Sequence, residues 1–302
     1  MTQPHNFEII FHTPGFRGYK TDEHDNQGVE EFVSVSITGT ACSLNCEHCN
    51  TKVLRGMTDL RRFDGSLYDL CESLVEGGTR GVLISGGSDL KGRVPLLPHI
   101  ADLKRIRSEL GMAVRVHVGL PDEETCAALG EVDLDGAMID IIGHRDTIRE
   151  VYHLDADLED YEDSLSWLEK YRVPMVPHIV LGLHYGKMLG EENALEMIVR
   201  HPPKLLALVV LMSISKTAMA NVTPPSLSEI GAFFGKTRKA LPSTPVMLGC
   251  ARPMGTMKVE IDRLAVDAGL NGIAFPAKGI VEYARQTGLH PQFVNACCGV
   301  TW

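Results

Sequence analysis

Short hydrophobic runs alternate with amphipathic stretches along the chain from residue 32 to about residue 287. The hydrophobic runs predict strands at 32–39, 81–85, 113–120, 136–142, 175–183, 206–213, 245–249 and 272–276. The stretches between them predict helices near 66–76, 93–110, 122–130, 162–171, 190–200, 226–240, 257–268 and 279–287. Strands that are hydrophobic along their whole length and alternate with helices indicate a parallel sheet with both faces covered.

The number and spacing of these units predict an α/β fold of the (βα)8 TIM-barrel type. Eight units over roughly 250 residues match that architecture, and an open, doubly wound sheet is the alternative. We expect one domain over residues 1–302, with the barrel at about 32–287. The segment 1–31 and the tail 288–302 would be short extensions over the two ends of the barrel. Functional residues would then lie where the strands end, at the carboxyl side of the barrel.

Charge and composition narrow the class of protein. The chain has 39 acidic and 29 basic residues, a formal net charge of −10, which argues against general nucleic-acid binding. No apolar run reaches the roughly 18 residues that span a membrane, and the N-terminus lacks the pattern of a secretory signal. We therefore expect a cytoplasmic protein with no membrane partner. In that compartment its eight cysteines would serve metal binding or catalysis rather than disulfides.

The first predicted strand runs directly into a loop with three cysteines. Cys42, Cys46 and Cys49 have the spacing Cys-x3-Cys-x2-Cys. Three thiolates in one loop can hold three irons of a [4Fe–4S] cluster and leave the fourth iron open to an external ligand. Zinc is the alternative, but a structural zinc site needs four closed ligands, and only His48 lies nearby.

Three further cysteines are predicted to form a second set. Cys250 ends the seventh strand, and Cys297 and Cys298 lie in the tail that follows the eighth unit. Because strands seven and eight are neighbours in a closed barrel, these thiols could converge over the same opening. The alternative is an incidental vicinal pair on the surface, where adjacent thiols invite oxidation. Cys71 and Cys126 instead lie on the apolar faces of predicted helices and are expected to be structural.

The triple-cysteine loop after the first barrel strand resembles that of the radical S-adenosylmethionine (SAM) enzymes, over essentially the whole chain. The resemblance implies a [4Fe–4S] cluster on the three cysteines whose open iron binds SAM, and reductive cleavage of SAM to a 5′-deoxyadenosyl radical. It also implies five SAM-binding positions. His48 replaces the family's usual aromatic residue, and Asp140 stands where relatives contact the ribose. Gly86, Gly87 and Ser88 match the family's Gly-Gly-Glu segment without its acidic residue.

Within that superfamily, the chain resembles the two-protein lipoyl synthase, which is similar to biotin synthase. The residues that carry this resemblance are Thr38-Gly39, the loop with Leu44 and His48, Leu54, Met57, Gly249-Cys250-x-Arg252-Pro253 and the cysteine-bearing tail. It implies an auxiliary [4Fe–4S] cluster on Cys250, Cys297 and Cys298 as the sulfur source, with Cys250 and Arg252 as catalytic residues. The reaction implied is the second sulfur insertion, at C6 of an 8-mercaptooctanoyl-lysine arm.

The same resemblance implies the partners. They are an octanoylated or mercaptooctanoylated lipoyl carrier domain, a partner radical SAM component of the synthase, and a reduced ferredoxin- or flavodoxin-type electron donor. A basic rim of Lys52, Arg55, Arg61 and Arg62 could receive the carrier, although a solvated face paired with Asp59 and Asp64 explains the same residues. Three alternatives for the function stay open: the first-sulfur (C8) component, another barrel radical SAM enzyme (biotin synthase-like, lyase or mutase), and an iron–sulfur carrier or electron-transfer protein.

Overall fold

The structure is a computed structural model, and it describes residues 8–15, 18–26 and 30–300. Its strands are β1 (Glu8–His12), β2 (Phe32–Ser36), β3 (Thr58–Asp59), β4 (Gly81–Ser85), β5 (Ala113–His117), β6 (Gly136–Asp140), β7 (Met175–Leu181), β8 (Leu206–Val210), β9 (Val246–Leu248), β10 (Gly272–Ala274) and β11 (His290–Val294). Its α-helices are α1 (Leu67–Glu76), α2 (Ile100–Glu109), α3 (Glu123–Gly130), α4 (Arg145–Glu150), α5 (Leu158–Lys170), α6 (Glu191–Arg200), α7 (Leu227–Ala240), α8 (Thr256–Asp267) and α9 (Ile280–Gln286). Three short 3₁₀ helices are η1 (Lys52–Gly56), η2 (Leu60–Arg62) and η3 (Leu97–His99).

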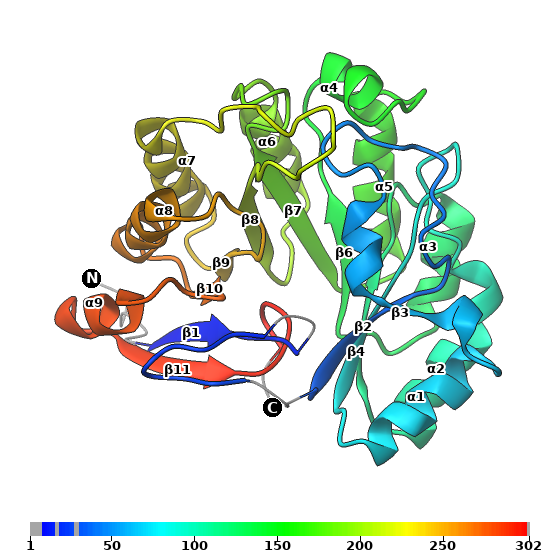
Figure 1. Cartoon of the computed structure of the whole chain (residues 1–302). Coiled ribbons are helices and arrows are strands. Elements are labelled where there is room, and N and C mark those ends of the chain that lie inside the picture. The colour runs from blue at the N-terminus through cyan, green and yellow to red at the C-terminus, as the bar shows by residue number, and fades with distance from the viewer. Residues whose placement is uncertain (1–7, 16–17, 27–29, 301–302) are drawn as a thin grey trace.

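All of these strands form one parallel sheet, which curls into a half-barrel with helices around its outside (Figure 1). The strand order is β11-β1-β10-β9-β8-β7-β6-β5-β4-β2-β3. The eight strands predicted from hydrophobicity are therefore present, in sequential order, from β2 to β10. The parallel α/β class is confirmed, and the carboxyl ends of the strands lie at one mouth.

The closure predicted for a (βα)8 barrel is not what the hydrogen bonds of the described residues show. β10 pairs with β1 rather than with β2, and β1 pairs in turn with β11. The extensions were expected to cover the two ends of the barrel, but each supplies a strand instead. β1 buries Ile9 and Phe11. Among the described residues that connect it to β2 there is no helix, so a repeat of strand–helix units in the sequence does not reveal it.

Helix boundaries follow the local capping chemistry. Ser66, Asp157 and Ser226 each accept a backbone hydrogen bond in the first turn of α1, α5 and α7, and each forms a reciprocal capping box. The helix predicted at 93–110 begins only at Ile100. Pro95 and Pro98 interrupt the preceding segment, which contains the short helix η3. The sequence pattern also did not predict α4.

The inner face of the half-barrel is filled by the C-terminal tail. Ala296, Cys297, Cys298 and Val300 pack in one buried cluster with side chains from six strands. Those side chains are Phe32, Leu83, Met138, Val176, Met247 and Ala274. The tail was predicted at an end of the barrel, and its position inside is a correction: its small and apolar side chains fill the space that the strands enclose.

Candidate metal centres and active site

The first cysteine loop leaves β2 through a tight turn. Ser36 Oγ donates to the Gly39 carbonyl at 2.6 Å, and Thr38 Oγ1 donates to the Ala41 carbonyl at 2.9 Å. Asn45 and Asn50 have φ of 49° and 43°, in the left-handed region that asparagine tolerates better than most residues. These turns curl the loop so that its cysteines face one another.

Two of the three sulfurs in this loop are close together. Atoms of Cys46, His48 and Cys49 lie within 4.8 Å of one another, and the Cys42 sulfur lies outside that group. The hydrogen bond from Cys46 lowers the pKa of Cys49, while the same contact and burial raise the pKa of Cys46. His48 also lowers the pKa of Cys49, and its buried Nδ1 has no hydrogen-bond partner in the described part of the chain. Because thiolates bind metal, the loop presents one ligand already in its binding form.

The Gly86–Ser88 segment lies directly against this loop. The Gly87 N–H donates to Thr38 Oγ1 at 2.7 Å, and the Ser88 N–H donates to the Cys42 sulfur at 3.4 Å. A Cβ on Gly87 would lie 2.0 Å from the Ala41 carbonyl oxygen and 2.4 Å from Cys42 Cβ. Only glycine fits this close approach. The segment that was predicted to contact SAM therefore packs directly against the cysteine loop.

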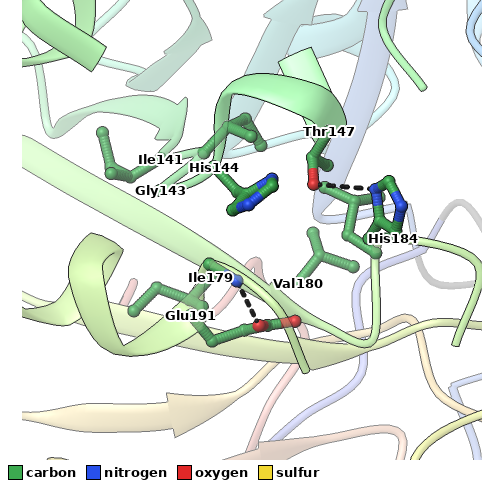
Figure 2. A pocket seen from close by; sticks show the side chains of 11 residues that line it. Ile141, Gly143, His144, Thr147, Ile179, Val180, His184 and Glu191 are labelled. Carbon is green, nitrogen blue, oxygen red and sulfur yellow. Dashed lines mark hydrogen bonds between the residues drawn. The ribbon is translucent and has the colours of Figure 1, made fainter. Parts of the chain in front are cut away.

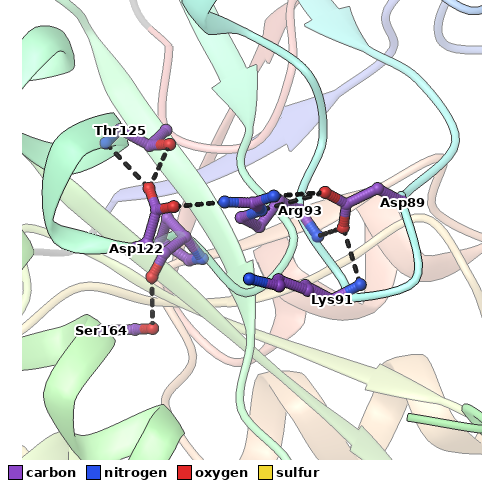
Figure 3. Close-up of polar contacts among 7 residues, drawn as sticks. Asp89, Lys91, Arg93, Asp122, Thr125 and Ser164 are labelled. Atoms are coloured by element: carbon purple, nitrogen blue, oxygen red, sulfur yellow. Dashed lines mark hydrogen bonds and ion pairs between the residues drawn. The ribbon is translucent and has the colours of Figure 1, made fainter. Parts of the chain in front are cut away.

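Asp89 does not take the place of the acidic residue that the resemblance lacks. Figure 3 shows its carboxylate turned to Arg93, with the Nε–Oδ2 distance 3.0 Å. Arg93 also pairs with Asp122, and Asp89 accepts the backbone N–H of Lys91. The carboxylate is therefore committed to its own loop.

Asp140 connects the cysteine loop to the mouth of the half-barrel. It ends β6 and accepts a hydrogen bond from the Tyr152 hydroxyl at 3.1 Å, and the Tyr152 carbonyl lies 3.9 Å from the Cys46 sulfur. The rings of His117 and His178, from the flanking strands β5 and β7, are 5.8 Å apart. Burial lowers the pKa of His178 to about 4 and also lowers that of His117.

A cleft of about 250 Å³ opens beside these groups, between the loops that follow β6 and β7 (Figure 2). In it the His184 Nδ1 lies 3.1 Å from Thr147 Oγ1. Glu191 is buried and accepts the N–H groups of Gly182 and Gly190, which fixes the loop after β7. Sequence reasoning did not single out Glu191 or Tyr152, because neither ends a strand.

The second set of cysteines is brought together inside the half-barrel. Cys297 and Cys298 are 5% and 3% exposed, and Cys250 packs against the same cluster. The Cys250 thiol and burial raise the pKa of Cys298, while the Cys297 thiol lowers it, so Cys298 interacts with both of the other thiols. Cys298 is thus the middle member of a three-thiol group, which lies inside the half-barrel rather than over its opening, where the sequence predicted it.

Two buried basic residues border this group, and the sequence analysis missed both. Arg115, on β5, donates from Nη1 to the Cys298 carbonyl at 2.5 Å. His12, on β1, accepts the Gly299 N–H at 3.2 Å, and burial followed by the Arg115 charge lowers its pKa to about 3. The available signal was position: each polar residue falls on the inner face of an otherwise apolar strand.

Arg252 has a different environment from the one that its predicted catalytic role requires. Its guanidinium forms a buried two-point ion pair with Asp262, at 2.6 and 3.1 Å. It also donates to the carbonyls of Gly249 and Phe275. The structure therefore uses Arg252 to hold the loops after β9 and β10, and so to position Cys250. A catalytic role for it stays a prediction.

Other predicted residues can be placed plainly. Cys71 and Cys126 are fully buried in α1 and α3. Arg61 and Arg62 both lie within ion-pair distance of Asp59, as the solvated-face interpretation expects. Lys52 instead donates to the Ser215 carbonyl. In the described ranges, no helix combines the length and apolar character that crossing a membrane requires.

Comparison with known proteins finds a relative in sequence and several relatives in fold. Mitochondrial biotin synthase from Emericella nidulans is 22% identical over 238 residues, which are 76% of this chain and 59% of that protein, so the chain spans under two thirds of the relative's length. Methylornithine synthase (PylB) shares the fold at a TM-score of 0.56 and 13% identity, over 88% of this chain and 86% of that one. No protein-family model matches the chain.

The FeFe-hydrogenase maturase HydG from Carboxydothermus hydrogenoformans gives a TM-score of 0.61 at 14% identity, over 95% of this chain and 68% of that one. The likeness of these two structures is one of overall fold, and it extends over most of the chain's half-barrel.

Proposed function

Given a chain with the radical SAM type of fold, we propose that it is a radical SAM enzyme that inserts sulfur at an unactivated carbon. The single observation that carries this proposal is the second thiol group, Cys250, Cys297 and Cys298, inside the same half-barrel whose mouth holds the first. The sequence similarity to a biotin synthase supports the reaction class.

The residues at the mouth fit a [4Fe–4S] cluster and SAM. The loop supplies three sulfurs, from Cys42, Cys46 and Cys49, and contains no fourth cysteine. The Gly86–Ser88 backbone packs against it. When bound, the cluster and SAM would supply the electron and the carbon radical that abstracts a hydrogen atom. The chain's own task there is positioning: Gly87 permits close approach, and Asp140 and Tyr152 order the mouth.

The residues inside the half-barrel fit a second, anionic cluster. Three thiols meet there beside Arg115, whose guanidinium is 1% exposed and forms no ion pair with any described carboxylate. A buried charge without a counter-charge is strongly disfavoured, so the site is expected to carry negative charge when loaded. Three thiolates around iron and sulfide would provide it. When bound, this cluster would supply the sulfide that the substrate carbon acquires.

The proposed substrate is an 8-mercaptooctanoyl-lysine arm that gains sulfur at C6. This assignment rests on the Gly249-Cys250-x-Arg252-Pro253 segment and the cysteine tail. The proposed partners are a lipoyl carrier domain, a second radical SAM component that acts at C8, and a reduced ferredoxin- or flavodoxin-type donor. A biotin synthase-like reaction is the second candidate, favoured by the Emericella relative.

The test is an anaerobic single-turnover assay with dithionite, SAM and two peptides, one octanoyl-lysyl and one 8-mercaptooctanoyl-lysyl, read by mass spectrometry. We expect a lipoyl product from the mercapto peptide alone. A mercapto product from the octanoyl peptide alone would assign the chain to the first insertion. Cleavage of SAM with no sulfur gained by either peptide would refute the lipoyl assignment, and dethiobiotin as a third substrate would then test the second candidate.

A further inference from the structure

We infer that Arg115 and His12 form the fixed frame of the second metal centre: Arg115 supplies its counter-charge and His12 latches the cysteine turn that holds it. This inference rests on the proposed function, because it assigns residues to the centre that function requires. Neither residue belongs to a cysteine motif, and they come from β5 and β1, far apart in the sequence.

Arg115 is placed for electrostatic work rather than for a structural ion pair. It is buried among apolar side chains of the inner face, and its Nε has no hydrogen-bond partner in the described part of the chain. Its Nη1 donates to the Cys298 carbonyl, which sets the guanidinium against the backbone of the vicinal cysteines. The charge of Arg252, by contrast, is neutralised by an ion pair with Asp262.

His12 fixes the other side of the turn. Its Nε2 accepts the N–H of Gly299, directly after the vicinal cysteines, while its buried Nδ1 has no hydrogen-bond partner in the described part of the chain. The neighbouring Thr13 Oγ1 donates to Asn295 at 2.9 Å, and the Asn295 side chain reaches Glu31 at 3.1 Å. The chain is thus held before, within and after the two cysteines.

Gly299 makes the close approach to Arg115 possible. Its φ is +73°, and a Cβ there would lie 2.3 Å from Leu205 Cδ1 and 3.4 Å from Arg115 Nη2. The turn lies flat against both side chains only because this residue has no side chain of its own. A cluster on Cys297 and Cys298 would therefore lie next to a charge that cannot move away.

The expected electronic consequence concerns the reduction potential. Nearby net charge and hydrogen bonds set the potential of an iron–sulfur cluster. A fixed guanidinium stabilises the reduced, more negative state, so its removal should lower the midpoint potential of the second centre and leave the first unchanged. A lysine at position 115 keeps the charge but not the planar fork, and should preserve most of the potential.

The experiment isolates the second centre in a background with Cys42, Cys46 and Cys49 all replaced by alanine. In that background we would compare Arg115 with R115K and R115M after anaerobic reconstitution. The measurements are iron and sulfide per chain, the electron paramagnetic resonance signal of the reduced state, and its midpoint potential. We expect R115M to lose the cluster or to shift its potential downward, and R115K to restore content and potential towards those of Arg115. R115M with unchanged content, signal and potential would overturn the role of Arg115.

Failure of the wider proposal would look different. If the triple-alanine protein with Arg115 intact binds no iron, the second centre itself is absent and the proposed function fails with it. Folding of each Arg115 variant is controlled in the otherwise wild-type chain by its far-ultraviolet circular dichroism and its urea-denaturation midpoint.

The role of His12 in holding the cysteine turn is tested in apo protein by alkylation of Cys297 and Cys298. H12F should speed labelling of both thiols several-fold, with Cys71 labelling as the internal control. Equal rates in wild type and H12F would overturn the role of His12.

Discussion

The two thiol sites of this half-barrel are built in opposite ways. The first is local: Cys42, Cys46 and Cys49 lie within one loop, shaped by its own turns and a neighbouring glycine. The second is assembled from distant segments: Cys250 comes from the end of β9, while Cys297 and Cys298 come from a tail folded into the barrel. The first lies at the mouth, with Cys42 and Cys49 half-buried; in the second, Cys297 and Cys298 are buried and Cys250 is half-buried.

This difference separates two chemical requirements. A site that receives a soluble co-substrate must be reachable, and its ligands can be carried by one flexible segment. A site that would give up sulfide to a carbon radical must exclude water and stray hydrogen donors, which requires walls from many strands. Variants that damage one site and spare the other therefore measure how independent they are.

The largest expected effect comes from removing one thiol at each site. Cys46→Ala should abolish both SAM cleavage and sulfur insertion, because the first centre loses a ligand. Cys250→Ala should keep SAM cleavage within about twofold of wild type, a free-energy change under about 0.5 kcal/mol, and reduce sulfur insertion to background. The measurements are 5′-deoxyadenosine by chromatography and product by mass spectrometry. Loss of both activities in Cys250→Ala would show that the sites do not divide the labour.

The next effect tests the close approach at the mouth. Gly87→Ala places a Cβ 2.0 Å from the Ala41 carbonyl, so the cysteine loop must move. Overpacking of this kind costs about 1–3 kcal/mol, and we expect SAM cleavage to fall at least tenfold. The matched control is Gly56→Ala, nearby in η1, where a Cβ would meet nothing within 4 Å. Equal SAM cleavage in the two variants would contradict a steric role for Gly87.

The third effect tests the tail inside the half-barrel. Gly299→Ala and Gly288→Ala both impose strain at a positive φ, of +73° and +84°, but only the first meets a neighbour, Leu205 Cδ1 at 2.3 Å. Shared backbone strain should cost each variant about 1 kcal/mol, and the clash should cost Gly299→Ala about 1–3 kcal/mol more. Urea denaturation measures both. Iron per chain should fall towards one cluster only in Gly299→Ala, and similar losses in both would argue that the tail contact is loose.

The same contrast, between local and distant contacts, explains which parts of the fold could be predicted from the sequence. The strands β2 and β4 to β10 and the Cys42 loop are encoded locally, by hydrophobic runs and by spacing, and both were predicted, whereas the two-residue strand β3 was not. β1 and β11 were not, because each is a short strand whose partners lie at the other end of the chain. A strand pairing between residues 10 and 272 produces no periodic hydrophobic pattern in the sequence around either residue.

The second site shows the same limit at the level of single residues. Convergence of Cys250 with Cys297 and Cys298 was predictable from strand order. Arg115 was not, because an arginine within an apolar strand identifies its function only when the groups opposite it are known. Arg252, the arginine that the sequence suggested, lies close to Cys250 along the chain. Its guanidinium is paired with Asp262, however, and that residue lies on α8.

The smallest expected effect concerns the link between the cysteine loop and the mouth. Tyr152→Phe removes the hydroxyl that donates to Asp140 and leaves the backbone near Cys46 intact. A lost hydrogen bond of this kind costs about 0.5–1.5 kcal/mol, so if Asp140 orders bound SAM, the apparent Kd for SAM should rise about two- to tenfold. Tyr171→Phe removes a hydroxyl that donates to the exposed Glu123 and serves as the control. A change in SAM affinity confined to Tyr152→Phe would extend the first site from its three cysteines to β6. Equal affinities would restrict that site to the loop and its glycine neighbour, which would make the contrast with the many-stranded second site complete.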